Sequence, residues 1–220
     1  MNKNHDWTFN STEIAASFDL HVREQLPWYD MATRAVAHII RHYLPEYGLI
    51  YDIGASNGNI GRSISDVVKR RGARVVAIEK SKEMADTYDG PGICVNADAI
   101  DFDFERYNVA VCFLVMMFLP VEDRKQWLQS LSNKIKPGGV MIIVDKTIGY
   151  DGYIGTVMRR LTIDGKISAG ADPKDVIEKE LSLSGVQRPV PLSLINSITP
   201  KPVEVFRFGE FVGWVVESPE

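Results

Sequence analysis

Apolar and polar positions alternate along this chain in blocks that predict helices and strands in turn. From residue 29 to residue 43 the apolar or small side chains recur at helical spacing, which predicts an amphipathic helix. The short apolar runs at 49–53 and 74–79 predict buried strands, and we expect a helix over about 59–70 between them, closed by Gly72. The first half of the chain therefore follows a repeating order of strand and helix.

The same order continues up to residue 146. The further predicted elements are a short helix capped by Ser81, strands at 92–96, 109–115 and 140–145, a helix over 122–135 and a turn at Pro137-Gly138-Gly139. Strands that are apolar on both faces and alternate with helices are typical of a parallel sheet covered on both sides. We therefore expect a doubly wound α/β fold with a mostly parallel, Rossmann-like sheet.

Both ends of the chain depart from this order. Residues 1–17 are polar and predict a flexible tail, with a single ordered domain over 18–220. Residues 149–202 have a mixed, partly helical pattern and are expected to form an insertion or lid. Residues 203–217 are two β-rich runs broken at Gly209, which predicts an antiparallel strand pair that completes a seven-stranded sheet.

Composition narrows the class of protein. The 220 residues are 45% hydrophobic and 25% charged, which is typical of one globular domain. The net charge of −4 disfavours nucleic acid as a partner. No apolar run approaches the ~20 residues of a membrane span, and the first residues lack the apolar stretch of a signal peptide, so we expect a cytoplasmic protein. Cys94 and Cys112 each lie in an apolar run and are expected to be reduced core thiols.

Residues that directly follow the predicted strands carry the candidate chemistry, because doubly wound folds bind ligands at the carboxyl ends of their strands. Gly54 and Gly58 follow the first strand and would let the backbone approach a ligand closely. Glu79, after the second strand, stands where an acid accepts hydrogen bonds from ribose hydroxyls. Asp98 follows the third strand, and the apolar run 113–118 ends the fourth. Together these features point to an adenosine ligand and, through the apolar run, to a small-molecule substrate.

The glycine-rich turn discriminates among adenosine cofactors. Gly54 is followed by Ala55 and Ser56, so the Gly-x-Gly-x-x-Gly pattern of dinucleotide sites is absent, and no Gly-Lys-Ser/Thr phosphate loop occurs in the chain. S-adenosylmethionine has no phosphate and needs only a pocket lined by backbone. The turn therefore favours S-adenosylmethionine, with S-adenosylhomocysteine as the product.

This order of motifs over residues 50–146 resembles the class I S-adenosylmethionine-dependent methyltransferases. Further runs are similar to the carboxy-S-adenosylmethionine synthase family, namely 18–22 (FDLHV), 27–29 (PWY), 51–56 (YDIGAS), 78–84 (IEKSKEM) and 208–209 (FG). Enzymes of that family transfer a carboxyl group from prephenate to the sulfonium, and their product serves in tRNA wobble-uridine modification.

The resemblance also implies site residues and a homodimer. It implies cofactor contacts at Tyr29, Gly54 to Ser56, Glu79 with Lys80, and Asp98 with Ala99. Asp52 and Gly58 of the glycine-rich turn and Phe113 at the end of the fourth strand complete the predicted cofactor site.

Two departures from the carboxy-S-adenosylmethionine synthases bear on the reaction. Their cofactor-binding asparagine falls on Phe113, which has no polar group to offer. Their carboxylate-binding arginine falls near 192–195, where no arginine stands, although Arg188 lies just before. We therefore favour methyl transfer to a small-molecule acceptor. Carboxy transfer and a non-catalytic S-adenosylmethionine-binding protein stay open as alternatives.

No catalytic residue is singled out by spacing. Methyl transfer from a sulfonium is an in-line displacement that alignment and exclusion of water can promote without an obligatory base. If the acceptor must lose a proton, the candidates for the base that accepts it are Asp145, Lys146, Tyr150 and His21. His38 and His42 lie one helical turn apart but lack a third ligand, so no metal site is expected.

Overall fold

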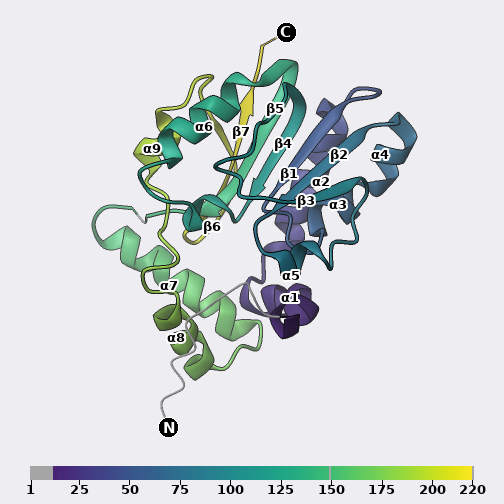
Figure 1. The fold of residues 1–220 in the computed structure, drawn as a ribbon. Coiled ribbons are helices and arrows are strands. Elements are labelled where there is room, and N and C mark those ends of the chain that lie inside the picture. The colour runs from purple at the N-terminus through teal and green to yellow at the C-terminus, as the bar shows by residue number, and fades with distance from the viewer. Residues whose placement is uncertain (1–11, 149, 220) are drawn as a thin grey trace.

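One mixed sheet runs through the computed structural model, which describes residues 12–148 and 150–219 (Figure 1). The strands of this part of the chain are β1 (Leu49–Ile53), β2 (Arg74–Glu79), β3 (Ile93–Asn96), β4 (Tyr107–Phe113), β5 (Ile135–Lys146), β6 (Val203–Phe208) and β7 (Phe211–Glu217). Their order is β3-β2-β1-β4-β5-β7-β6, in which β1 to β5 are parallel and β7 is antiparallel to both neighbours. The doubly wound α/β class, with its C-terminal antiparallel pair, is confirmed.

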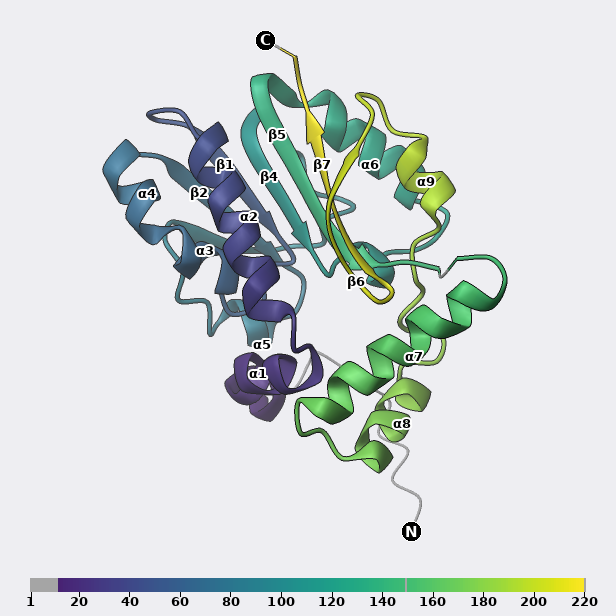
Figure 2. The same ribbon diagram turned by 180° about the vertical axis from the view of Figure 1, so that it is seen from behind.

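Helices lie on both faces of the sheet and beyond its strand ends. They are α1 (Thr12–Gln25), α2 (Tyr29–Tyr43), α3 (Asn59–Ser63), α4 (Ser65–Arg71), α5 (Lys82–Ala85), the 3-10 helix η1 (Met116–Phe118), α6 (Arg124–Asn133), α7 (Tyr153–Ser168), α8 (Pro173–Ser182) and α9 (Leu192–Asn196). Helices α6 and α9 lie on one face, and α2, α3 and α4 on the other (Figures 1 and 2).

Two hydrophobic cores result, one on each face of the sheet. Successive strand side chains point to opposite faces, so Ile50 packs in the core that holds Val36 and Ile40 of α2, whereas Tyr51 packs in the core that holds Leu128 of α6. Every residue of β1 is buried. The sheet order reverses between β1 and β4, which is the switch point where such folds bind ligands.

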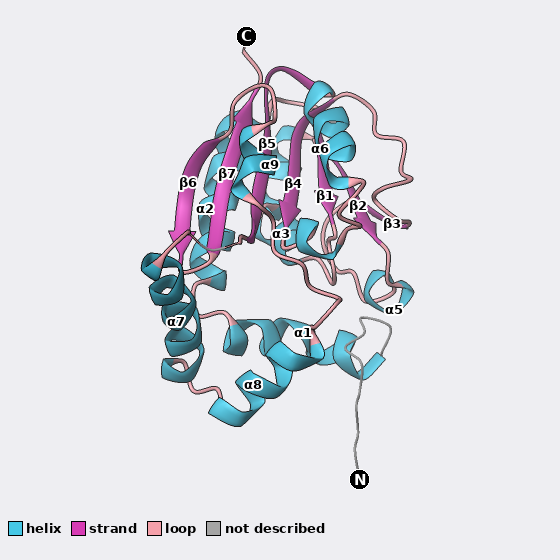
Figure 3. Cartoon of the chain, turned by 90° about the vertical axis from the view of Figure 1, so that its left-hand side faces the viewer, coloured by secondary structure: helices cyan, strands magenta, loops and turns pink. Residues whose placement is uncertain are grey.

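Three helices lie beyond the carboxyl ends of the parallel strands. Figure 3 shows α1, α7 and α8 as a separate group below this edge of the sheet, and we call them the covering helices. Helix α1 begins at Thr12, so residues 12–17 are helical although the sequence pattern placed them in a tail. The rest of the predicted tail lies outside the described residues. Helix α9 lies in the predicted insertion, but it packs against the sheet through Leu192, Leu194 and Ile195.

The helix expected over 59–70 is two helices, α3 and α4. Ile64, between them, is fully buried and has non-helical dihedral angles (φ −116°, ψ 4°). The hydroxyls on both sides bond to nearby carbonyls: Ser63 Oγ donates to Ile60 O (2.7 Å), and Ser65 Oγ donates to Arg62 O (2.9 Å). Such bonds compete with the helical hydrogen-bond pattern. Gly72 ends α4 in the left-handed conformation, as predicted.

Two predicted strand limits are also corrected. Strand β4 ends at Phe113 and not at residue 115, because Leu114 has a positive φ of 61° and turns the chain into η1. The Pro137-Gly138-Gly139 segment is not a turn before the fifth strand but part of β5, which starts at Ile135. Gly138, with φ 68°, donates its amide to Ser218 O (3.2 Å), so the chain bends there without leaving the sheet.

Two further features of the described residues concern the cysteines and the helices. Cys94 and Cys112 carry free thiols; Cys112 is buried in β4, whereas Cys94 lies on the edge strand β3 and is only partly buried, so it is not the core thiol that was expected. None of the helices within residues 12–148 and 150–219 has the length and apolar character that a membrane crossing requires.

Candidate functional site

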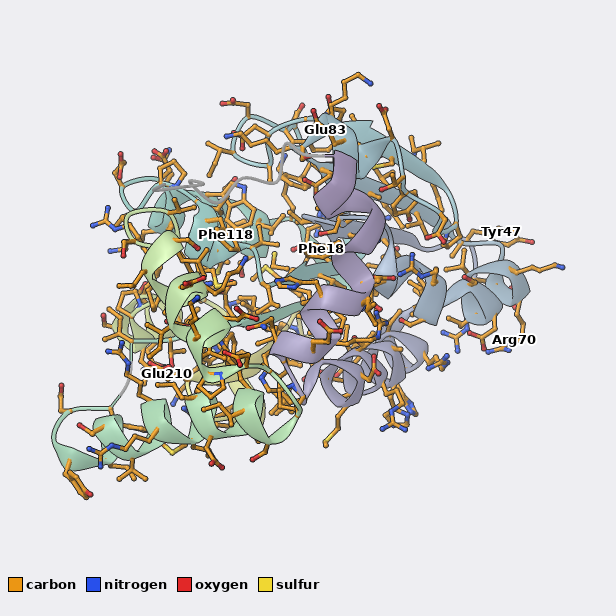
Figure 4. All side chains as sticks on the ribbon, turned by 90° about the horizontal axis from the view of Figure 1, so that it is seen from below. Phe18, Tyr47, Arg70, Glu83, Phe118 and Glu210 are labelled. Atoms are coloured by element: carbon orange, nitrogen blue, oxygen red, sulfur yellow. The ribbon has the colours of Figure 1, made fainter. Side chains whose placement is uncertain are left out.

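A cavity of about 520 Å³ opens at the carboxyl ends of the parallel strands, beneath the covering helices. Seen from this side in Figure 4, Phe18 of α1 and Phe118 of η1 lie toward the middle of the molecule, and both line the cavity. Twelve of the residues predicted for the site line it, namely His21, Tyr29, Asp52, Gly54, Ala55, Ser56, Glu79, Lys80, Asp98, Ala99, Phe113 and Lys146. The cavity therefore brings together residues from both halves of the sheet.

The turn after β1 is held against β2 by its own backbone. The amides of Gly54 and Ala55 both donate to Ile78 O, at 2.8 and 3.1 Å. Gly54 has φ 65°, and a Cβ added there would lie 2.5 Å from Val115 Cγ2. Glycine is thus required at residue 54 for both conformation and space. Ser56 also has a positive φ, 48°, so the turn is tightly coiled beside the cavity.

Glu79 joins the ends of β1 and β2. Its Oε2 accepts from the Ser56 amide (2.8 Å) and its Oε1 accepts from the Ser81 amide (2.9 Å). Burial raises the pKa of the Glu79 carboxyl above its usual value, although these amide hydrogen bonds oppose the shift. The carboxylate has about four acceptor positions, and the amides of Ser81, Ser56 and Lys80 engage it, so Glu79 could still accept a hydroxyl group of a ligand.

Asp52 carries a polar atom that no group of the described residues satisfies. Asp52 is one of the lining residues but is only 2% exposed, and its buried Oδ2 has no hydrogen-bond partner among the described residues. Burial raises the pKa of Asp52 to about 7. An orphaned buried carboxylate oxygen is costly unless a ligand pairs with it.

Asp98 is held in place by two donors. Lys80 Nζ lies 2.7 Å from its Oδ2, and the amide of Ile100 donates to its Oδ1 at 3.0 Å. Burial would raise the pKa of Asp98, but the hydrogen bond from Lys80 holds it below its usual value. Asp98 therefore stays ionised beside Ala99 at the rim of the cavity.

Tyr29 and Phe113 form an aromatic wall of the cavity. The rings of Tyr29 and Phe113 meet edge to face with centroids 5.3 Å apart, and Trp28 packs 6.4 Å from Phe113. Burial holds the pKa of the Tyr29 hydroxyl well above its usual range, so it stays neutral. The side chain at residue 113 thus extends the wall and supplies no hydrogen bond to the cavity.

Charged side chains gather at the other end of the cavity. Lys146 Nζ, at the end of β5, lies 3.4 Å from Glu180 Oε2 and donates to Gln187 Oε1 at 3.1 Å. Lys166 Nζ of α7 lies 3.0 Å from Glu180 Oε1. Burial alone would raise the pKa of Glu180, but Lys146 and Lys166 hold it below its usual value. Lys179 also lines this end.

His21 of α1 faces the same end. Burial lowers the pKa of its imidazole, and the positive charges of Lys179 and Lys166 lower it further, while Glu24 opposes them. The His21 ring is therefore neutral at pH 7. Of the four candidate bases, His21 and Lys146 line the cavity.

Three predicted site residues do not line the cavity. Asp145 is fully buried beneath it and accepts from the amides of Met116 (2.7 Å) and Lys146 (2.8 Å), which fixes the turn after β4. Tyr150 lies outside, with the Arg207 guanidinium 5.0 Å from its ring centroid. Gly58, with φ 99°, shapes the glycine-rich turn but packs against Gly90.

Several lining residues were not predicted. They include Phe18, Gln25, Asn59, Lys166, Lys179 and Glu180. Phe18 begins the run 18–22 and Asn59 directly follows Gly58, so nearness in sequence to predicted site residues could have suggested both. The residues of α7 and α8 lie far along the chain, and no sequence pattern related them to the strand ends.

The described residues contain no cluster of three or more His, Cys, Asp or Glu side chains that could hold a metal ion. The rings of His38 and His42 lie 4.7 Å apart on α2.

The amino-acid sequence of the chain is similar to those of known proteins. Residues 51–143 match the family model described as a methyltransferase domain. The carboxy-S-adenosyl-L-methionine synthase of Staphylococcus epidermidis is 29% identical over 217 residues, which cover 94% of this chain and 95% of that protein.

Solved structures share the fold. The magnesium protoporphyrin IX methyltransferase of Synechocystis, solved with bound SAH, matches with a TM-score of 0.63 and 15% identity over 96% of this chain and 95% of that one. Human N-acetylserotonin methyltransferase, solved with SAM, matches with a TM-score of 0.60 and 10% identity over 96% of this chain, which spans 58% of that protein. The expected resemblance is confirmed: residues 51–143 match a methyltransferase-domain model, and the chain shares the fold of solved methyltransferases.

Proposed function

We propose that this protein is an S-adenosylmethionine-dependent methyltransferase that acts on a small-molecule acceptor. The main support for this proposal is that one cavity is lined by the glycine-rich turn, Glu79 and Asp98, by an apolar wall and by the covering helices. This is the position where doubly wound folds take nucleoside ligands.

The residues present fit S-adenosylmethionine. The unpartnered Asp52 Oδ2 offers an acceptor for a cationic or hydroxyl group, and the lone pairs left on Glu79 suit ribose hydroxyls. The backbone of Gly54 lines the cavity, and the edge-to-face rings of Tyr29 and Phe113 offer an apolar surface. We propose that Lys80, Ala55, Ser56, Asp98 and Ala99 complete this cofactor site.

When bound, S-adenosylmethionine supplies a methyl group activated by a positively charged sulfur. The chain itself would align the acceptor and exclude water, which is where most of the acceleration of such a displacement arises. We propose that α1, α7 and α8 act as the lid. If the acceptor must lose a proton, neutral His21 is better placed than Lys146, because the Lys146 ammonium already donates to Gln187.

A small molecule suits this cavity better than a nucleic acid. The basic run Lys69-Arg70-Arg71 ends α4, where cations complement the helix dipole. Arg70 lies at the periphery of the molecule, far from Phe118 and the cavity (Figure 4). This basic run therefore does not lead toward the proposed site.

Carboxy transfer is the second candidate, favoured by the similarity to a carboxy-S-adenosyl-L-methionine synthase over 94% of the chain. The position expected for its carboxylate-binding arginine lies on α9, which packs against the sheet and does not line the cavity. Cationic groups reach the cavity from β5, α7 and α8 instead, so the missing arginine is a weaker argument against this reaction. The same similarity leads us to propose a homodimer.

One experiment separates the two reactions. The protein is incubated with S-adenosylmethionine that carries an isotopic methyl label, either with a deproteinised metabolite extract or with prephenate, and the products are read by mass spectrometry. Methyl transfer predicts labelled small molecules and S-adenosylhomocysteine in the first sample. Carboxylated S-adenosylmethionine in the second sample would favour carboxy transfer, and no product in either would contradict both.

A further inference from the structure

Two of the three covering helices are attached directly to the body of the molecule. Helix α1 is held at α3, because the Arg62 guanidinium pairs with Asp19. Arg23 of α1 also donates to Asn59 Oδ1, at 3.1 Å. The buried Val22 packs with the core on that face of the sheet. Helix α1 is therefore fixed relative to the strands.

Helix α7 packs on the turn between β6 and β7. The buried Thr162 accepts a hydrogen bond from the Glu210 amide at 3.2 Å. A Cβ added at Gly209 would lie 2.3 Å from Thr162 Oγ1, and one added at Gly165 would lie 3.1 Å from the Phe208 ring. Such close packing leaves α7 little room to shift relative to the sheet.

Helix α8 differs because a glycine in open space stands beyond each of its ends. Gly170 has φ 105° and Gly185 has φ 80°, and a Cβ added at either would meet no atom within 4 Å. The backbone at both glycines can therefore rotate without a side chain in the way. Ile177 and Leu181 are 61% and 68% exposed, and Figure 3 shows α8 apart from the sheet. The covering helix that can turn on its two ends is α8.

The segment after Gly185 is bonded to the sheet. The Arg188 amide donates to Met117 O, and the Val190 amide donates to Lys146 O, both at 2.8 Å. The glycine at the other end of α8 follows the firmly packed α7. Fixed segments thus lie on both sides of α8, so a rotation at the two glycines moves α8 and leaves its neighbours in place.

Glu180 holds α8 against the cavity. Its Oε1 lies 3.0 Å from Lys166 Nζ of α7, and its Oε2 lies 3.4 Å from Lys146 Nζ at the end of β5. Lys146 also donates to Gln187 in the fixed segment, so its ammonium group stays in position when α8 moves. With α8 in place, the two lysine side chains are only 7% and 8% exposed.

We infer that α8 is a gate over this end of the cavity, with hinges at Gly170 and Gly185 and a latch at Glu180. The inference rests on the proposed function and deepens it. The end of the cavity at Lys146 and Lys166 is the one left for the acceptor, which must enter, be shielded from water and leave as product. Of the proposed lid, α8 moves, whereas α1 and α7 stay with the sheet.

Hydrogen exchange of the ligand-free protein tests the latch. Glu180→Gln removes both ion pairs and should speed amide exchange in residues 174–182 by about tenfold, because α8 opens more often. Exchange in α1 and α7 should keep its wild-type rate. Glu178→Gln makes the same change on the exposed side of α8, where Glu178 pairs loosely with Lys174 at 3.7 Å, and should have no effect.

Gly185→Asn tests the hinge with the opposite sign. Asparagine tolerates a positive φ but has fewer accessible dihedral angles than glycine, and the open space admits its side chain. The variant should slow exchange in α8. It should also slow acetylation of Lys146 and Lys166 by acetic anhydride, read by mass spectrometry, while the exposed Lys174 reacts as in wild type. General damage to the fold would speed these reactions.

Three outcomes would overturn the gate: wild-type exchange in α8 of Glu180→Gln, faster exchange throughout that variant, or wild-type acetylation of Lys146 and Lys166 in Gly185→Asn. Calorimetric titration with S-adenosylhomocysteine separates this inference from the proposed function. If S-adenosylhomocysteine does not bind but α8 responds as expected, the proposed cofactor fails and the gate stands. If it binds but neither variant changes exchange in α8, the gate fails and the proposed cofactor stands.

Discussion

The carboxylate of Glu79, at the end of β2, accepts a hydrogen bond from the amide of Ser56, 2.8 Å away in the turn after β1. The same side chain accepts from the amide of Ser81. One buried acid therefore fixes the relative position of two strand ends, and the shape of the proposed cofactor site depends on it.

Replacing Glu79 should weaken cofactor binding. Glu79→Ala leaves two amides without their acceptor, and each unpaired group costs about 1–3 kcal/mol. Calorimetric titration with S-adenosylhomocysteine should show a loss of affinity of at least about tenfold. Glu105→Ala, which removes an exposed acid paired with Arg74, serves as the control and should bind normally. Equal affinity of Glu79→Ala and wild type would refute the site assignment.

The glycine at residue 54 should be required for two separable reasons. Gly54→Ala forces a Cβ to within 2.5 Å of Val115 Cγ2 and places alanine at φ 65°. Gly170→Ala tests the dihedral effect alone, because Gly170 has φ 105° with open space around it. We expect Gly54→Ala to lower the free energy of unfolding by more than Gly170→Ala does, which should cost about 1 kcal/mol.

Val115→Ala completes this comparison. In the Gly54→Ala background it should recover part of the lost stability by relieving the steric clash, while the dihedral penalty remains. Denaturant unfolding of the single and double variants measures the recovery. Strict additivity of the two substitutions would contradict the close contact.

Asp52 should make stability depend on pH. Burial raises its pKa to about 7 in the native state, whereas the unfolded state releases this proton near pH ~4. The native state therefore binds more protons between these values, and the free energy of unfolding should fall as the pH rises through that window. Asp145, whose pKa burial also raises to about 7, should contribute in the same direction.

Asp52→Asn isolates one of these two contributions. The amide cannot ionise, so the variant should gain stability relative to wild type from pH 4 to pH 8, by an amount on the order of a few kcal/mol. Thermal or denaturant unfolding across the pH range measures the difference. A difference that stays constant with pH would mean that Asp52 titrates normally.

Arg62 should anchor α1 over the cavity. Its guanidinium pairs with Asp19 of α1 and with Asp89, and it donates to Asn57 O at 2.7 Å. Because half-exposed ion pairs contribute little to global stability, Arg62→Gln should change the free energy of unfolding by less than about 1 kcal/mol. It should, however, speed amide hydrogen exchange in residues 18–25 and weaken binding of S-adenosylhomocysteine.

Arg70→Gln is the matched control for this prediction. Arg70 pairs only loosely with Asp66, at 3.8 Å on the surface of α4. Its loss should leave exchange in α1 unchanged. The same exchange rates in Arg62→Gln and wild type would show that α1 is held by other contacts.

The parallel part of the sheet could be predicted because the sequence pattern that indicates each strand lies within the strand and its flanking residues. Strand β1 is buried throughout and lies between Gly48 and Gly54, and β2 starts shortly after Gly72 and ends at Glu79, so their limits follow directly from the sequence. The break between α3 and α4 escaped prediction because serine hydroxyls near Ile64, and not a proline or glycine, interrupt the helix.

The charged end of the cavity could not be predicted for a different reason. In α7 the inward-facing residues Thr162 and Lys166 are buried, whereas Tyr153 and Ile154 are exposed. This reverses the usual rule that apolar side chains mark the buried face of a helix. The sequence pattern therefore places Lys166 on the surface, and only the fold shows that α7 brings it to the cavity.

Calorimetric titration of the wild-type protein with S-adenosylmethionine, S-adenosylhomocysteine, NAD and ATP measures the selectivity of the proposed cofactor site. We expect one site per chain for the first two ligands and no binding of NAD or ATP, because the turn at Gly54 lacks both phosphate-binding patterns. Binding of NAD or ATP, or no binding of any of the four, would contradict this expectation.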